Sequence, residues 1–112
     1  MHELTYARNL AYLIFKQINE KKPKKVKSIT FVIGNASGIE KEFLEHSFKE
    51  HIFKNTICEY AELIFKTENP KIKCKKCTKE YNEAILNCDC GSSDFDIVSG
   101  KDVYIESIEF EF

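Results

Sequence analysis

The sequence has no long apolar run, no marked excess of charge and no internal repeat. No stretch approaches the roughly 18 consecutive apolar residues of a membrane-spanning helix, so no membrane span is expected. The N-terminus lacks the charged segment and apolar run of a secretory signal peptide. With 17 Lys and Arg against 18 Asp and Glu, no overall basic field attracts nucleic acid or anionic lipid. These absences predict a cytoplasmic protein that binds neither membrane nor nucleic acid.

The patterns of the common catalytic centres are also missing. The sequence has no glycine-rich phosphate loop, no Ser/His/Asp set and no pair of catalytic carboxylates. A redox C-x-x-C normally opens a helix directly after a strand, where the helix dipole lowers the thiol pKa. The pair at Cys74 and Cys77 lies instead among lysines and polar residues, with more cysteines nearby. We therefore expect no enzyme.

Hydrophobic periodicity predicts two helices and three strands. Apolar residues recur at helical spacing over residues 3–20 and again over about 40–54. Residues 25–33, 57–66 and 102–112 alternate between apolar and polar side chains, as strands do. In the second helix, the residues expected to face inward are Phe43, Leu44, Phe48, Ile52 and Phe53.

A polar, lysine-rich segment that carries four cysteines separates the last two predicted strands. This cysteine module, residues 70–100, reads as a zinc-binding insertion between two strands of the main sheet. Residues 1–69 and 101–112 would then form an α/β domain that binds nickel through its N-terminal residues. The predicted fold class is α+β: two helices packed on a small three-stranded sheet, with an inserted zinc-ribbon-like module.

The cysteines of this module have the spacing of a structural zinc site. Cys74 and Cys77 are followed, after ten residues, by Cys88 and Cys90. Two short loops can each deliver two thiolates to one metal, and the nearby lysines favour the thiolate form. About 30 residues with few apolar groups cannot fold alone, so metal binding would supply the missing free energy, on the order of 10 kcal/mol. Four thiolate ligands leave no open position, which predicts a structural rather than a catalytic zinc.

The first three residues form a second candidate metal site. A bulky residue at position 2 should prevent removal of Met1, so that the α-amine stays on that residue. The Met1 amine, the His2 amide and the His2 imidazole can close adjacent chelate rings, and the Glu3 amide can complete a planar set of nitrogens. Ni(II) and Cu(II) favour such a set, whereas zinc does not. A chance histidine at position 2 remains the alternative from these residues alone.

Three further residues could ligate a metal but are not predicted to do so. Cys58 lies in an apolar run and is interpreted as a buried hydrophobic residue. His46 and His51 lie five positions apart on the second predicted helix, which places them about 140° apart around an α-helix axis. They are therefore expected not to converge on one ion.

Several motifs together resemble the HypA family of hydrogenase-maturation nickel chaperones. They are MHELxxAxxL at the start, Ile33-Gly34, the first C-x2-C and a closing C-G-S…S-G-K-D-V-Y-I-x-S-I-E. The resemblance covers essentially the whole chain. It implies that His2 is the chief nickel ligand, with backbone nitrogens from Met1 and Glu3. It also implies a structural zinc at Cys74, Cys77, Cys88 and Cys90, although the family usually has C-x2-C where this chain has C-x-C.

The implied function is that of a metallochaperone with two metals, transported Ni(II) and structural Zn(II). The resemblance implies delivery of nickel to the large-subunit precursor of [NiFe]-hydrogenase, together with a HypB-type GTPase and, in some bacteria, urease maturation proteins. The alternative is a zinc-ribbon module that binds nucleic acid or protein without nickel transfer. Binding to DNA or RNA that persists at physiological salt would favour this alternative.

Overall fold

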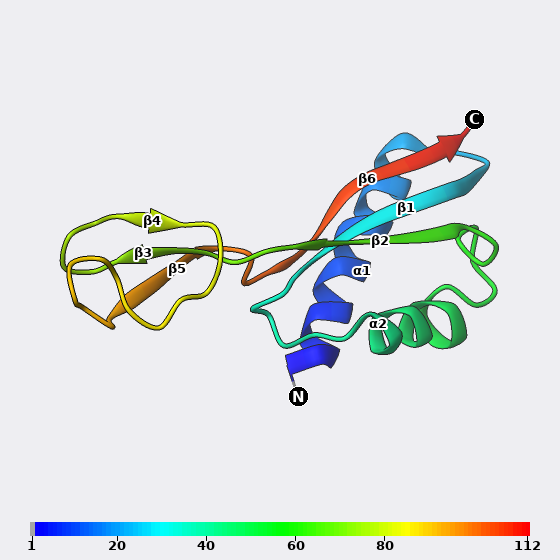
Figure 1. The fold of residues 1–112 in the computed structure, drawn as a ribbon. Coiled ribbons are helices and arrows are strands. Elements are labelled where there is room, and N and C mark those ends of the chain that lie inside the picture. The colour runs from blue at the N-terminus through cyan, green and yellow to red at the C-terminus, as the bar shows by residue number, and fades with distance from the viewer. Residues whose placement is uncertain (1) are drawn as a thin grey trace.

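The computed structural model describes the backbone of residues 2–112 and the side chains of residues 5–112. Figure 1 shows two helical segments packed beside one small sheet, and a second small sheet at the other end of the molecule. Of the helices within residues 2–112, none has the length and apolar content to cross a bilayer. The elements are α1 (His2–Lys21), β1 (Lys25–Gly34), α2 (Lys41–Ser47), η1 (Phe48–Ile52), β2 (Glu62–Glu68), β3 (Lys71–Cys74), β4 (Glu80–Tyr81), β5 (Phe95–Ser99) and β6 (Val103–Glu111).

The main sheet has three strands in the order β2-β1-β6. Strand β1 pairs in parallel with β2 and antiparallel with β6, so the two strands on either side of the cysteine module flank one central strand. The predicted α+β fold is thereby confirmed, with two helices on a three-stranded sheet and an inserted module that carries the cysteines.

One hydrophobic core joins the sheet to both helices. Helix α1 contributes Ala7, Leu10 and Ile14, each of which is buried against the central strand and its neighbours. The Phe31 ring of β1 lies 5.1 Å from both the Phe48 and the Phe65 ring centroids, which ties the second helical segment and β2 into the same core.

The second helical segment differs from the uniform α-helix predicted over 40–54. After α2 the chain continues as the π-helix η1, and the Phe53 N–H donates to the Phe48 carbonyl oxygen at 2.8 Å, an i→i−5 bond. The wider turn puts both Phe48 and Phe53 into the core, with ring centroids 4.9 Å apart. Phe43 was expected to face inward, and this was wrong, because its side chain is 39% exposed.

Strand β2 begins later than predicted. Residues 57–60 form turns, because the Thr56 hydroxyl accepts from the Cys58 N–H and the Ala61 N–H donates to the Cys58 carbonyl oxygen. These bonds compete with extended pairing, so pairing with β1 starts only at Glu62. Cys58 is buried in this turn, and burial raises its thiol pKa to about 11, which fits a hydrophobic residue without chemistry.

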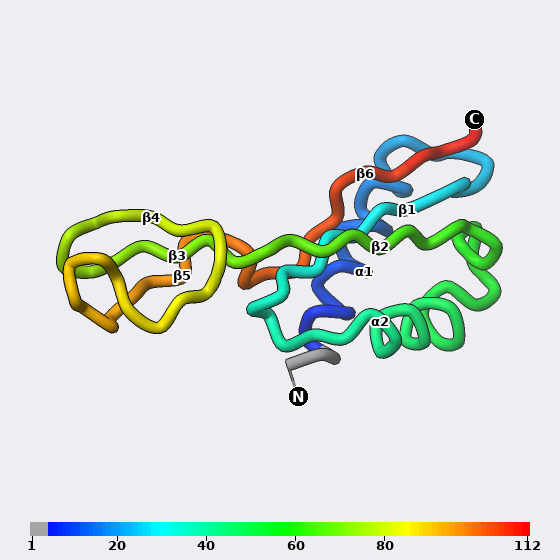
Figure 2. The backbone as a smooth tube through the Cα atoms, in the orientation of Figure 1, coloured from blue at the N-terminus to red at the C-terminus, as the bar shows by residue number. Residues whose placement is uncertain are grey.

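The second sheet, in the order β4-β3-β5, extends the molecule along one axis (Figure 2). The radius of gyration is 17.4 Å and the dimensions are 56 × 26 × 18 Å. A compact chain of this length would have a radius of gyration of about 13 Å. We propose that the two sheets mark two domains, with the cysteine module as the inserted one.

The two sheets meet where β1 ends and the chain returns into β6. The Gly34 N–H donates to the Asp102 carbonyl oxygen at 2.8 Å, and the Ala36 N–H donates to the Gly100 carbonyl oxygen at 2.9 Å. A Cβ on Gly34 would lie 2.3 Å from the Gly100 carbonyl oxygen, so only glycine allows this backbone approach.

Candidate metal centre

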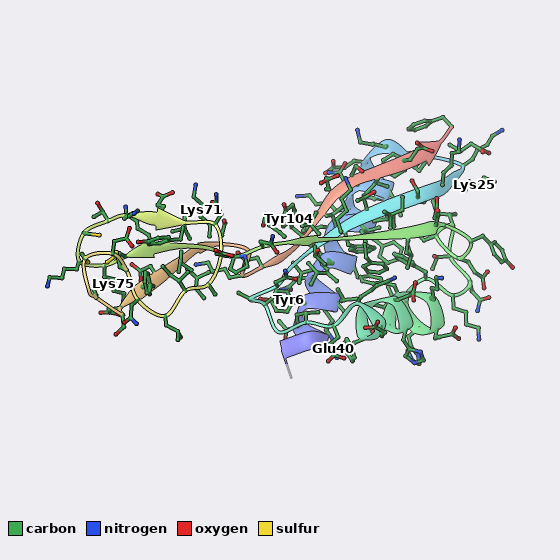
Figure 3. All side chains as sticks on the ribbon, viewed as in Figure 1. Tyr6, Lys25, Glu40, Lys71, Lys75 and Tyr104 are labelled. Atoms are coloured by element: carbon green, nitrogen blue, oxygen red, sulfur yellow. The ribbon has the colours of Figure 1, made fainter. Side chains whose placement is uncertain are left out.

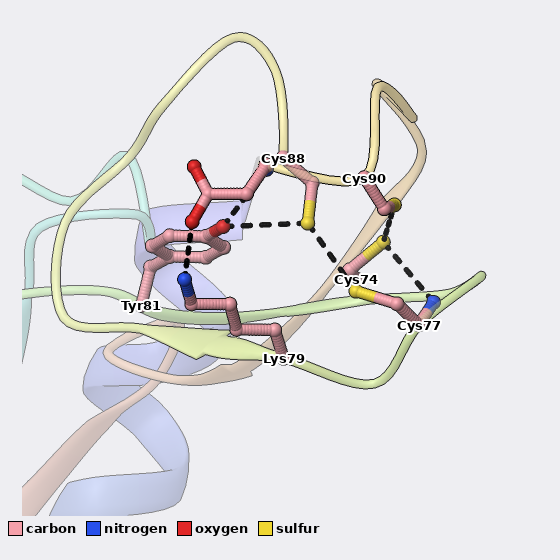
Figure 4. A network of polar contacts seen from close by, with 7 residues as sticks. Cys74, Cys77, Lys79, Tyr81, Cys88 and Cys90 are labelled. Carbon is pink, nitrogen blue, oxygen red and sulfur yellow. Dashed lines mark hydrogen bonds and ion pairs between the residues drawn. The ribbon is translucent and has the colours of Figure 1, made fainter.

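The four predicted zinc ligands come together at the far end of the cysteine module (Figure 4). The sulfur atoms of Cys74, Cys77, Cys88 and Cys90 all lie within 4.8 Å of one another. The Cys74 and Cys90 sulfurs are 3.7 Å apart, and the Cys77 and Cys88 sulfurs are 3.3 Å apart. A tetrahedral site with metal–sulfur bonds of about 2.3 Å has sulfur–sulfur distances of about 3.8 Å. The arrangement therefore fits one four-coordinate metal.

Two tight turns present the cysteine pairs. In the first, the Thr78 N–H donates to the Cys74 carbonyl oxygen and the Cys77 N–H donates to the Cys74 sulfur. In the second, the Gly91 N–H donates to the Cys88 carbonyl oxygen, and Gly91 adopts φ +92°. The C-x-C pair is thus presented by a turn that needs glycine one position after it, rather than by a regular strand.

The hydrogen bonds at the cysteines lower the pKa of two of the thiols. The Cys90 N–H and the Tyr81 hydroxyl lower the pKa of Cys88 to about 6, and the Cys77 N–H lowers the pKa of Cys74. At Cys77 the Lys79 N–H lowers the pKa, but the Cys88 sulfur, burial and the sulfurs of Cys90 and Cys74 together outweigh it and raise the pKa to about 12. Without metal the Cys77 thiol therefore keeps its proton at neutral pH. Metal binding must displace such protons, so acid competes with the metal.

Tyr81 supports the ligand Cys88 from the second layer of contacts. Its hydroxyl donates to the Cys88 sulfur at 3.3 Å and accepts from the Asp89 N–H at 3.2 Å. The Lys79 ammonium lies 5.3 Å from the centroid of the Tyr81 ring and forms an ion pair with Asp89. The spacing of the cysteines did not identify Tyr81. The one available signal was its place as the only aromatic residue between the two cysteine pairs.

Replacing Tyr81 by phenylalanine is expected to weaken metal binding about tenfold, because a partner that orients a ligand typically contributes 10- to 100-fold to affinity. The measurement is competition for the metal with a chromophoric chelator. Tyr104→Phe is the matched control, since the Tyr104 hydroxyl donates to Glu68 in the main sheet at 3.2 Å. Equal affinities of the two variants would contradict the role assigned to Tyr81.

Carboxylates neutralise several of the lysines around the cysteines. Figure 3 labels Lys71 and Lys75 on the cysteine module. Lys71 forms an ion pair with Glu80 at 2.9 Å, and Lys75 lies 3.6 Å from carboxylate oxygens of both Asp94 and Asp96. Lysines engaged in this way do not form a uniformly basic surface for phosphates.

The predicted nickel residues lie outside the described side chains. Met1 is not described, and of His2 and Glu3 only the backbone is described, at the start of α1. Sequence reasoning thus remains the basis for the role of these residues.

Comparison with known proteins identifies the family. The model of the family "Hydrogenase/urease nickel incorporation, metallochaperone, hypA" matches residues 1–110. The chain belongs to the HypA family. Its function is accordingly that of a nickel metallochaperone in hydrogenase or urease maturation, a maturation factor with a four-cysteine metal site.

Individual HypA proteins are similar over nearly their whole length. The hydrogenase maturation factor HypA of Aquifex aeolicus is 39% identical over 115 residues, which cover 99% of this chain and 98% of the relative. HypA of Caldanaerobacter subterraneus is 35% identical over 99% of this chain and 100% of the relative. The solution structure of the Ni metallochaperone HypA from Helicobacter pylori shares the fold, with a TM-score of 0.75, 21% identity and 97% of each chain covered.

Proposed function

We propose that this HypA protein binds Ni(II) at its N-terminus and holds Zn(II) in its four-cysteine site. In the nickel site, His2 supplies the imidazole and its backbone amide, Met1 the α-amine and Glu3 a further backbone nitrogen. The observation that carries the proposal is the family match from residue 1, which includes Met-His-Glu. A planar nitrogen set favours Ni(II), whereas four thiolates at tetrahedral distances favour zinc.

Position supports separate roles for the two metals. The helix α1 begins at His2, so the proposed nickel residues would lie at its N-terminal end, where they would be open to a partner. The four cysteines lie in the cysteine module, with Cys74 at the end of β3, and Cys74 and Cys88 are buried. A site with four protein ligands and no open position holds its metal as part of the fold, while a terminal site can exchange it.

The acceptors follow from the family. We propose that the chain works with a HypB-type GTPase in the cytoplasm and delivers nickel to the large-subunit precursor of [NiFe]-hydrogenase. Urease maturation proteins are a second class of recipient. The family description, which names hydrogenase and urease together, supports both.

The test is a Ni(II) titration of the zinc-loaded protein with an untagged N-terminus, beside His2→Ala. The variant is expected to bind nickel at least about 100-fold more weakly, which corresponds to about 2.8 kcal/mol, and to retain its zinc. Asn9→Ala, at an exposed position of α1, is the control and should bind like the parent protein. Tight stoichiometric binding in His2→Ala would overturn the proposed N-terminal site.

A further inference from the structure

Two histidines form a pair on the second helical segment, far from the cysteines in the sequence. The ring centroids of His46 and His51 are 5.2 Å apart with an interplanar angle of 76°, and both side chains are exposed. Their convergence contradicts the expectation that they lie about 140° apart.

The π-helix explains this convergence. Residues five apart align along a segment with i→i−5 hydrogen bonds, and η1 begins between the two histidines. The same widening that brings Phe48 and Phe53 together in the core brings His46 and His51 together in solvent. Short π-helical segments are rare and occur frequently at functional sites.

The separation of the rings suits a shared metal ion. The rings lie edge to face, so both must turn for one nitrogen of each to point to a common ion. An ion about 2.1 Å from each of these nitrogens would lie about 3.2 Å from each ring centroid, and centroids 5.2 Å apart then correspond to an angle of about 110° at the metal. This value lies at the tetrahedral angle and within reach of the 90° of square or octahedral coordination. Imidazole is a ligand that nickel, copper and zinc accept.

We propose that His46 and His51 form a second, weak and exchangeable Ni(II) site. Among the described residues, only the four cysteines form a group of three or more metal-ligating side chains, so water completes the coordination at the histidines. Of the neighbouring acidic groups, Glu45 lies 3.7 Å from the Lys49 ammonium. Two protein ligands and several waters make a site that both takes up and releases metal readily. Such a site suits a metal ion that is being transported rather than one that stays bound. The proposal does not depend on the N-terminal site.

The pair lies on the helical segment that contacts α1. Helices α1 and α2 contact each other on the main sheet, and Figure 1 shows α2 beginning beside the N-terminal end of α1. Nickel bound at the histidines would therefore lie on the α/β domain that contains the main sheet, apart from the cysteine module.

The test uses the full, zinc-loaded chain in a His2→Ala background, which removes the N-terminal site and keeps the two proposals distinguishable. Ni(II) alone is titrated while amide NMR signals are followed. Saturable perturbation centred on residues 46–52 is expected, and His46→Gln and His51→Gln should each lower the affinity at least about tenfold. Lys54→Gln, at an exposed position just beyond the π-helix, is the matched control.

Unchanged nickel affinity in both glutamine variants, or perturbation centred elsewhere, would overturn the second site. Both rings are exposed, so glutamine at either position should leave the amide spectrum of the core unchanged. Because each histidine is replaced separately, one well-folded variant is enough to decide the question.

Discussion

Removal of the metal from the four-cysteine centre is expected to unfold the cysteine module while the main sheet and its helices stay folded. The reason is the lack of an apolar core in this part of the chain. Among its apolar residues other than cysteine, Ile72 is buried, and the half-buried rings of Tyr81 and Phe95 lie edge to face. Leu86, Ile97 and Val98 are 86%, 43% and 47% exposed. Metal binding at such a site contributes on the order of 10 kcal/mol, which no other contact of the module replaces.

The measurement is amide NMR of the protein before and after treatment with a strong chelator, and of Cys88→Ala. Dispersed signals from β3 and β5 should collapse in both cases, while those from β1 and β6 persist. Addition of zinc should restore the signals of the chelated parent protein. Cys58→Ala is the control, because this buried thiol lies in the main core and the variant should retain one bound metal. A metal-free module with dispersed signals would show that side-chain packing alone holds it.

Gly34→Ala is expected to destabilise the protein by about 3 kcal/mol, the upper end of the range for forced overpacking. The new Cβ would lie 2.3 Å from the carbonyl oxygen and 2.4 Å from the carbonyl carbon of Gly100. Both are backbone atoms and cannot rotate away as a side chain would. Gly100 cannot move away easily, because it has a positive φ of +78° and is itself tightly packed. A Cβ on Gly100 would lie only 2.5 Å from the Asn69 carbonyl oxygen. The substitution therefore forces apart the strands that connect the two sheets.

Urea unfolding followed by circular dichroism measures the change. Gly38→Ala is the matched control, because Gly38 has a positive φ, +76°, but no heavy atom lies within 4 Å of the place that a Cβ would take there. It should lose about 1 kcal/mol, from backbone strain alone. If both variants unfolded at the same urea concentration, the close approach of Gly34 to Gly100 would not matter for stability.

The elements with long, regular patterns could be predicted from the sequence. The apolar stripe of α1 and the alternation in β1 and β6 gave bounds within two residues of those found. The prediction failed where local hydrogen bonds decide the backbone. The Thr56 side chain holds residues 57–60 in turns, and the i→i−5 bond at Phe53 widens the second helix. Neither feature leaves a periodic signal, because each depends on one or two local hydrogen bonds.

Some residues of the candidate sites could likewise be predicted from the sequence, and others could not. The spacing of the four cysteines was sufficient to group them, since short loops bring neighbouring thiols together whatever the rest of the fold does. Tyr81 could not be assigned, because its contact with Cys88 depends on how β4 pairs with β3. The N-terminal nickel residues rest on the motif and the family, and the histidine pair required the π-helix.

The elongated form of the chain also sets how much surface it offers. Its accessible area is 7426 Å², whereas a compact monomer of the same mass exposes about 6,400 Å². The difference, about 1,000 Å², exceeds the roughly 800 Å² that each partner contributes to a standard protein–protein interface. By separating its two sheets, a chain of only 112 residues gains an additional surface as large as one partner's share of a standard protein–protein interface.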